Sequence, residues 1–122
     1  MMNLDGMAML VSSTAANGVV GSDTRLHFSQ NGARVAARYA GGNVARGWLI
    51  GTLTGSRVAF RYVQREVADG IHHGHSVGYL ERRSNGRVRM VENFTWDSRS
   101  GSGTNVFDEV PAESPTQDRR PT

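Results

Sequence analysis

Short turn-forming pairs recur along this chain at nearly regular intervals, and they limit its possible folds more than any other feature. They are Asn17-Gly18, Asn31-Gly32, Gly41-Gly42, Gly55-Ser56, Asp69-Gly70 and Asn85-Gly86, with a glycine-rich stretch at Gly101 and Gly103. Asn-Gly and Asp-Gly pairs supply the positive φ angles that tight β-hairpins require. The segments between them alternate Val, Phe, Tyr, Trp and Thr with other residues, and none sustains helical spacing. The pattern predicts an all-β antiparallel meander of seven or eight strands.

Such a meander has one bulky face that must be hidden from water. The opposite face carries arginines that suit solvent, namely Arg57, Arg61, Arg65, Arg82, Arg87 and Arg89. A chain of 122 residues hides the bulky face most simply by closing the sheet on itself, which also removes the unpaired edges. We therefore expect a small up-and-down barrel of the lipocalin or avidin kind, with a β-sandwich as the alternative.

The barrel is expected to form a single domain over residues 1–110, in which residues 1–18 could be loosely ordered. After Val110 the sequence becomes PAESPTQDRRPT, with three prolines and no apolar cluster. Such a segment cannot bury enough apolar surface to offset the entropy of ordering it. This composition predicts a disordered tail at residues 111–122.

The remaining composition narrows the class of protein. The absence of cysteine excludes disulfides, thiolate catalysis and cysteine zinc sites. No apolar run approaches the roughly 20 residues of a membrane helix, and the first residues lack the features of a secretory signal, so we expect a cytoplasmic protein. All fourteen basic residues are arginine, which is typical of GC-rich bacterial genomes, and a net charge of +3 is too small by itself to indicate nucleic-acid binding.

Two-residue loops at Asp69-Gly70 and Asn85-Gly86 place the bulky residues of three successive segments on one face. These residues are Phe60, Tyr62, Gln64, His75, Val77, Tyr79, Glu92, Phe94 and Trp96. In this register Tyr79 lies opposite Glu92, and His75 lies between Gln64 and Trp96. A slip of one residue moves a whole strand to the other face, so the agreement of both loops supports the register.

Loops at Asn31-Gly32 and Gly41-Gly42 bring Arg46 and Trp48 to the same face. A two-residue loop at Gly55-Ser56 conflicts with this, because it aligns Leu49 instead of Trp48 with the bulky face of the next strand. We therefore expect a bulge or a three-residue loop near Gly55-Ser56, helped by a neighbouring glycine.

The assembled face predicts a ligand pocket inside the barrel. Its aromatic residues are Trp48, Tyr62, Tyr79, Phe94 and Trp96, and its polar residues are Arg46, Gln64, His75 and Glu92. Apolar walls with a few convergent polar groups are typical of small-molecule sites, although the same aromatics also suit a plain core. No P-loop, dinucleotide fingerprint or nucleophile elbow is present, so we expect no cofactor.

Glu92 is the candidate for chemistry within this pocket. A carboxylate inside a barrel needs a partner, and burial raises its pKa, which suits a general acid or base. His75 is the second catalytic candidate, at the rim of the pocket. A purely structural interaction of Glu92 with Arg46 or Tyr79 is the alternative.

Three of the four histidines fall in the stretch HHGH, at residues 72–75. His73 and His75 are two residues apart on a strand, so they share a face as metal-binding pairs do. A third ligand would have to come from Glu66, Glu81 or Glu92. No further histidine faces inward in this register, so we favour a polar hairpin end over a metal site.

Two stretches carry a family resemblance. The segments YAGGNVARGWLIG, from Tyr39 to Gly51, and RVRMVENFTW, from Arg87 to Trp96, resemble a group of small bacterial proteins labelled N-acetylglutamate synthase. The similarity covers most of the chain from about Thr24 to Val110. It implies a shared fold and pocket, without a reaction.

Together these features predict a barrel that binds a small organic molecule, in bacterial specialised metabolism. The alternatives are a biosynthetic enzyme for cyclisation, elimination or isomerisation on the same barrel, or a non-catalytic partner subunit of such an enzyme. A protein partner or a second copy of the chain remains open, and no membrane contact is indicated. We expect no nucleic-acid binding, because the aromatics that could stack on bases lie on the face opposite the arginines.

Overall fold

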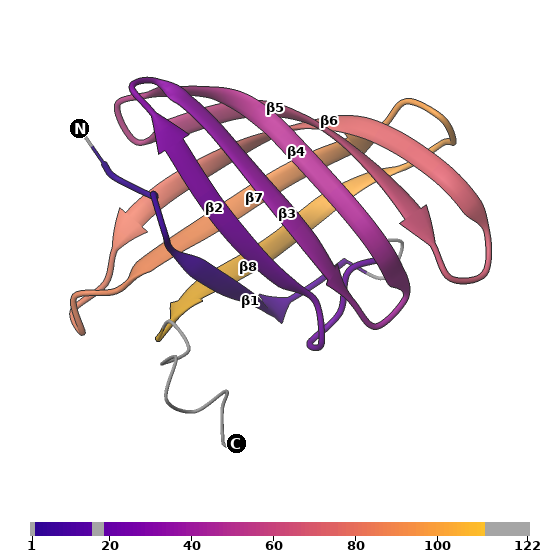
Figure 1. Ribbon diagram of the computed structural model, residues 1–122, viewed down its shortest axis with the longest axis horizontal. Helices are drawn as coiled ribbons and strands as arrows, with labels where there is room; N and C mark the ends of the chain where they lie inside the picture. Colours follow the sequence, from indigo (N-terminus) through magenta and orange to yellow (C-terminus); the bar gives the residue numbers. More distant parts are fainter. Residues whose placement is uncertain (1, 16–18, 112–122) are drawn as a thin grey trace, which may run out of the picture.

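The computed structural model describes residues 2–15 and 19–111, and these residues form eight β-strands (Figure 1). The strands are β1 (Ala8–Ser13), β2 (Arg25–Asn31), β3 (Arg34–Gly41), β4 (Val44–Thr54), β5 (Arg57–Glu66), β6 (Gly70–Arg82), β7 (Val88–Trp96) and β8 (Ser102–Val110). The predicted all-β meander is confirmed, with eight strands. The described residues include no helix of the length and hydrophobicity needed to cross a membrane.

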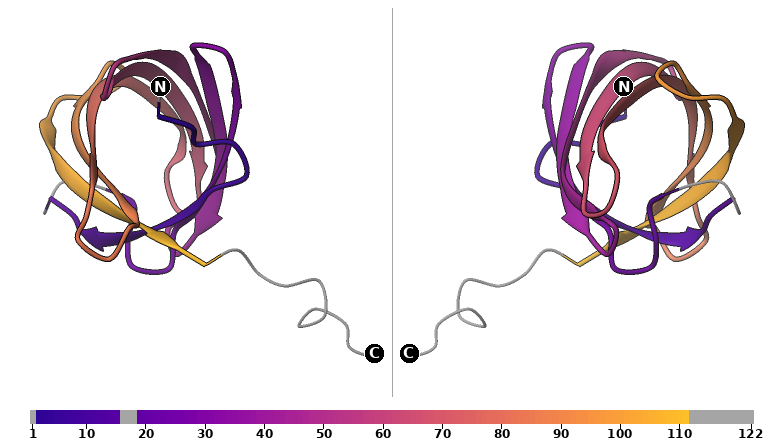
Figure 2. Two further views of the ribbon diagram at one scale, coloured as in Figure 1. Left: turned by 90° about the vertical axis from the view of Figure 1, so that its left-hand side faces the viewer. Right: turned by 90° about the vertical axis from the view of Figure 1, so that its right-hand side faces the viewer.

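The sheet closes on itself. Each strand pairs antiparallel with the next, and β8 returns to pair with β1. Viewed from its two ends, the molecule is a closed ring of strands (Figure 2). The predicted up-and-down barrel is therefore confirmed, and the alternative sandwich is not what forms.

The N-terminal segment takes part in the barrel, whereas the barrel ends just before the C-terminal segment. Residues 8–13, within the segment expected to be loosely ordered, form β1 and take part in closing the barrel. Residues 16–18 lie outside the described part of the chain. The predicted tail begins at Pro111, and its residues 112–122 also lie outside the described residues.

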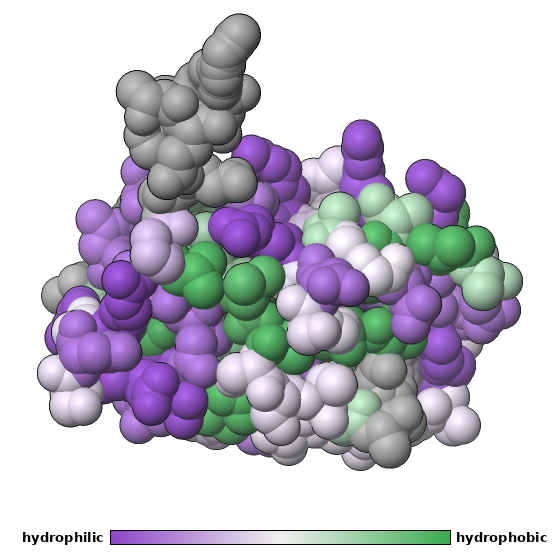
Figure 3. All heavy atoms as spheres, turned by 90° about the horizontal axis from the view of Figure 1, so that it is seen from below, coloured by the Kyte–Doolittle hydropathy of each residue, from purple (hydrophilic) through white to green (hydrophobic). Residues whose placement is uncertain are grey.

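Successive side chains along each strand point alternately inward and outward, and the inward side chains form the hydrophobic core of the barrel. The most completely buried large side chains are Leu4, Met9, Met90, Val35, Val44, Val58 and Val88. The six arginines predicted to face solvent are all exposed or partly exposed. Seen from below, the surface shows apolar side chains interspersed with hydrophilic ones (Figure 3).

Strand β6 presents the opposite face from the one predicted. Residues 67–69 form the turn before it, so that Glu66 pairs with Gly70, and residues 83–87 form the turn after it, so that Arg82 pairs with Val88. These turns shift the expected pairing by three residues and by one residue. Both shifts are odd, so β6 alone is inverted while β5 and β7 keep the predicted face. The prediction that β6 turns its bulky residues inward is wrong.

Small residues on the inner face of β6 explain the inversion. Gly74, Ser76 and Gly78 face the interior. A Cβ atom added at Gly74 would lie 2.3 Å from the Tyr62 hydroxyl, and one at Gly78 would lie 2.8 Å from the Met90 sulfur. Large residues on β5 and β7 already fill this space, and a third bulky strand would overpack the barrel.

Strand β4 is also inverted. Gly41 pairs with Val44, but the ladder then shifts, so that Trp48 pairs with Arg38 on the outer face. The prediction that Arg46 and Trp48 face inward is wrong, because this irregular turn changes the pairing by an odd number of residues.

The turn between β4 and β5 differs from the expectation too. Thr54 pairs with Arg57, which leaves a two-residue loop at Gly55-Ser56 and no bulge there. The irregularity instead falls between Val44 and Arg46, at the other end of β4. The two-residue turn that the Gly55-Ser56 pair indicates is therefore present. The conflict in the predicted register came from the turn between β3 and β4.

Candidate functional site

The barrel encloses a pocket whose walls are mainly apolar. Its lining consists of Val19, Val20, Leu26, Tyr39, Leu49, Phe60, Tyr62, Gln64, Met90, Glu92, Phe94, Trp96, Asn105 and Phe107. The space left between these side chains is about 30 Å³, enough for a water-sized group. A larger ligand therefore requires part of the wall to move. Val19 and Val20 are the wall residues that lie outside the strands.

Glu92, on β7, is the polar centre of this pocket and is 6% exposed. The Ser76 hydroxyl donates a hydrogen bond to one carboxylate oxygen at 2.6 Å, and the Asn105 amide donates to the other at 3.0 Å. Burial raises the pKa of Glu92, and the two hydrogen bonds limit that rise. The predicted inward position is what the structure shows. Its partners, however, are Ser76 and Asn105, not Tyr79 or Arg46.

A second set of hydrogen bonds leads from the pocket to its rim. The Tyr39 hydroxyl donates to the Gln64 carbonyl oxygen at 2.9 Å, and the Gln64 amide donates to a Glu66 carboxylate oxygen at 2.9 Å. Arg99, in the turn between β7 and β8, donates to the same oxygen of Glu66. Glu66 is nearly buried, so this ion pair supplies the compensation that a buried carboxylate needs. Burial also raises the pKa of Tyr39, which keeps its hydroxyl a hydrogen-bond donor.

Trp96 carries the one buried pocket donor that is unused among the described residues. The residue is 7% exposed, and its indole nitrogen has no hydrogen-bond partner. Tyr62 packs edge-on against its ring at a centroid distance of 5.4 Å, and the Arg99 guanidinium lies 4.2 Å from the ring centroid. Buried donors are rarely left unpaired, and this nitrogen has almost no accessible surface, so a bound molecule reaches it only if the pocket wall moves.

The predicted site residues divide into two groups. Tyr62, Gln64, Glu92, Phe94 and Trp96 line the pocket together. Arg46, Trp48, His75 and Tyr79 lie on the outer surface, where Trp48 is 51% and Tyr79 48% exposed. The prediction that these four share the interior with Glu92 is wrong, since β4 and β6 are inverted.

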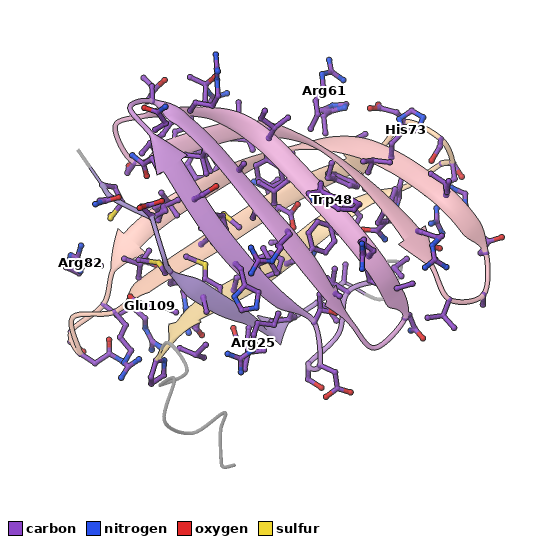
Figure 4. The ribbon with its side chains drawn as sticks, in the orientation of Figure 1. Arg25, Trp48, Arg61, His73, Arg82 and Glu109 are labelled. Atoms are coloured by element: carbon purple, nitrogen blue, oxygen red, sulfur yellow. The ribbon has the colours of Figure 1, made fainter. Side chains whose placement is uncertain are left out.

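The three histidines of the HHGH stretch lie outside the interior pocket. His73 is exposed and, with Arg61, points away from the barrel (Figure 4). His75 is also on the outer face, where its Nδ1 lies 3.0 Å from Asp97. The two therefore share a face as predicted, but it is the outer one, and neither lies near Glu92.

A different set of side chains lies close enough to share a cation. Glu66, Asp69 and His72 place one ligand atom each within 4.8 Å of one another. The Arg99 guanidinium contacts Glu66 and lies 3.9 Å from Asp69, so a side-chain cation already compensates these carboxylates. This arrangement favours an ion-pair network over a metal site.

The sequence did not reveal four polar residues of the site: Tyr39 and Asn105, which line the pocket, and Ser76 and Arg99, which hydrogen-bond to its carboxylates. Ser76 would have been predicted as an inward residue if the opposite face of β6 had been assigned to the interior. Asn105 pairs with Glu92 across β7 and β8, but no turn signal set the register of that hairpin. Arg99 lies in a loop, and loop side chains have no periodicity to read.

The fold and the pocket define the class of this protein as a small eight-stranded antiparallel barrel with a polar centre in an apolar interior. The chain belongs to the avidin-like protein family, whose family model matches residues 2–110. Searches of curated proteins and of solved structures gave no significant match. The avidin-like architecture is thus confirmed, whereas the N-acetylglutamate synthase label is not supported.

Proposed function

We propose that the barrel binds a small organic molecule whose buried part is largely apolar and uncharged. The observation that carries this proposal is the unpaired indole N–H of Trp96, which lies in the pocket that also holds Glu92. A ligand oxygen or nitrogen would accept that hydrogen bond. The aromatic and aliphatic walls would contact its apolar body, as in other small-molecule sites.

The charge of the pocket argues for a neutral buried group. Its lining includes the carboxyl group of Glu92 and no arginine or histidine. An anionic group would lose its hydration inside the barrel without gaining an opposite charge there. Arg99 does not supply that opposite charge, because its guanidinium is already paired with the Glu66 carboxylate at the rim.

Catalysis is a second candidate function. The observation in its favour is the buried carboxyl group of Glu92 with its raised pKa, a property that general acids share. His75 lies on the outer surface, so Glu92 would have to act without it. The binding experiment below also separates the two functions. After incubation with the protein, mass spectrometry of each test compound shows whether it was only bound or was converted to a product.

The test is a calorimetric titration with a panel of small molecules, with biotin included because of the family to which the chain belongs. Each neutral amide, lactam or phenol is paired with a carboxylate of similar skeleton. We expect the neutral member of a pair to bind more tightly. If the carboxylates bind as well as their neutral partners, the proposed ligand class is wrong.

Trp96→Phe tests the hydrogen bond itself, because it keeps an aromatic ring and removes the donor. We expect a loss of affinity of about 2- to 13-fold, which corresponds to a typical net hydrogen bond of about 0.5–1.5 kcal/mol. Trp48→Phe is the matched control on the outer surface and should leave this affinity unchanged. Equal affinities of Trp96→Phe and the parent protein would show that the indole N–H does not contact the ligand.

A further inference from the structure

The outer surface of the barrel holds a second hollow, which shares only Tyr39 with the lining of the interior pocket. It has a volume of about 400 Å³ and lies over β2, β3 and β4. Its lining comprises Arg25, His27, Arg38, Tyr39, Ala40, Arg46 and Trp48. This volume is within the range of small-molecule sites and needs no rearrangement of the wall.

The hollow lies in the most basic part of the molecule. From Thr24 to Arg65 the chain contains seven of its fourteen arginines and none of its eleven acidic residues. These residues include strands β2 to β4 and strand β5 as far as Arg65, the residue before the buried Glu66, so the outer face of half of the barrel wall carries positive charge alone. A cluster of one sign raises the local concentration of counter-charged ligands.

The arginines of the hollow are not neutralised by any residue that the structure describes. Arg25, Arg38 and Arg46 come from three neighbouring strands, which are about 4.8 Å apart. None of the three forms an ion pair with a described residue. The three are not directly opposite one another, since Arg25 pairs with Ala40 and Arg38 with Trp48, but they lie at nearby diagonal positions, and a bound anion would lower the repulsion among them.

Trp48 adds an aromatic surface to this basic hollow. Its side chain is 51% exposed and lies opposite Arg38 in the β3–β4 ladder. The Arg46 guanidinium lies 5.7 Å from the centroid of the indole ring. Figure 4 shows Trp48 over β4 and Arg25 toward the lower end of the same side of the barrel. We expected no nucleic-acid binding because the aromatic side chains were predicted to face the interior, but Trp48 lies on the outer face beside the arginines.

We propose that this outer hollow binds a nucleotide unit, either a free nucleotide or part of a single-stranded nucleic acid. The base stacks on Trp48, and the arginines contact the phosphate. Guanidinium groups suit phosphate because they donate two parallel hydrogen bonds, and stacking on an aromatic ring accepts any base. Duplex nucleic acid fits poorly, since its bases are already stacked on one another. The site is independent of the ligand proposed for the barrel interior.

The experiment measures the fluorescence anisotropy of a labelled single-stranded oligonucleotide at low salt. Arg38→Gln and Trp48→Ala are compared with Arg57→Gln, which removes an exposed arginine outside the hollow. We expect Trp48→Ala to weaken binding about tenfold, the usual effect of losing one stacked base. Arg38→Gln should weaken it several-fold and reduce the slope of log affinity against log salt by about 1. Arg57→Gln should change the affinity less than twofold.

Competition identifies the source of the nucleotide unit. A free mononucleotide that competes as well, per molecule, as the oligonucleotide indicates a nucleotide site. An affinity that increases with oligonucleotide length indicates a single-strand site, and either result supports the proposal.

Four results would overturn the proposal. These are no measurable binding, equal binding of the duplex form, competition by polyglutamate as effective as by the oligonucleotide, and an Arg57→Gln effect equal to that of Arg38→Gln. Circular dichroism of each variant confirms that the barrel has folded, so a lost signal cannot be attributed to unfolding.

Discussion

A single buried carboxyl group illustrates what the interior of this barrel does to a side chain. Glu92 is held between Ser76 and Asn105, and its low exposure raises its pKa. The sequence was sufficient to identify this residue, because an acidic residue flanked by Met90 and Phe94 on one strand face has to be buried with them. Its partners were not identifiable, since they belong to other strands and depend on register.

The raised pKa of Glu92 predicts how stability depends on pH. The folded protein keeps this proton over a range in which the unfolded chain has lost it. The free energy of unfolding should therefore fall as the pH rises above the ordinary value of 4.5, until the raised pKa is passed. Glu92→Gln removes this contribution, so the stability of the variant relative to the parent protein should increase with pH over that range.

Urea denaturation at a series of pH values, from about 4 to about 9, measures this dependence. Glu81→Gln, which changes an exposed carboxylate, is the matched control and should follow the parent profile closely. Parallel profiles for Glu92→Gln and the parent protein would contradict the proposed protonation.

At the scale of strands, the interior is divided between large and small residues. β5 and β7 supply Phe60, Tyr62, Met90 and Phe94, while β6 supplies mainly glycine and serine on its inner face. From the sequence we expect every strand to turn its bulkiest residues inward. That expectation fails for β6, because the diameter of an eight-stranded barrel limits the total volume of inward side chains.

Gly74→Ala tests the need for a small residue on β6. Its methyl group would lie 2.3 Å from both the Tyr62 hydroxyl and the Thr95 carbonyl oxygen. We expect a loss of stability of about 1–3 kcal/mol, the usual cost of overpacking. Gly21→Ala, where an added Cβ atom would have no neighbouring atom within 4 Å, should change stability by less than about 0.5 kcal/mol. Urea denaturation of both variants decides this, and equal stabilities would refute the packing argument.

For the whole molecule, closure of the sheet is the decisive property. The closing strand β1 is paired with β2 only from Ala8 to Leu10, whereas β5 and β6 are paired along the whole of β5. A closed barrel has no free edge, but its protection against local opening can still vary around the ring. The seam between β1 and β2 is therefore where the barrel should open first.

Amide hydrogen exchange can locate this opening. We expect the amides of β1 to exchange faster than those of β5 and β6, because fewer ladder hydrogen bonds must break to release β1. Strand β8 serves as an internal control, since it adjoins β1 but is also paired with β7 from Arg89 to Thr95. Protection of β1 equal to that of β5 and β6 would show that the barrel opens only by global unfolding.

The sequence by itself determined the strands and their antiparallel order, because local turn chemistry and period-two alternation encode these features. It favoured closure over a sandwich, but the pairing of β1 with β8 that closes the barrel joins the two ends of the sheet and is seen only in the tertiary structure. It also identified Tyr62, Gln64, Glu92, Phe94 and Trp96 as interior residues. The inner faces of β4 and β6 were decided only by the tertiary structure. An odd change in turn length inverts a strand, and the total volume of side chains inside the ring selects which turn length forms. This placed Trp48 outside the barrel and Ser76 beside Glu92.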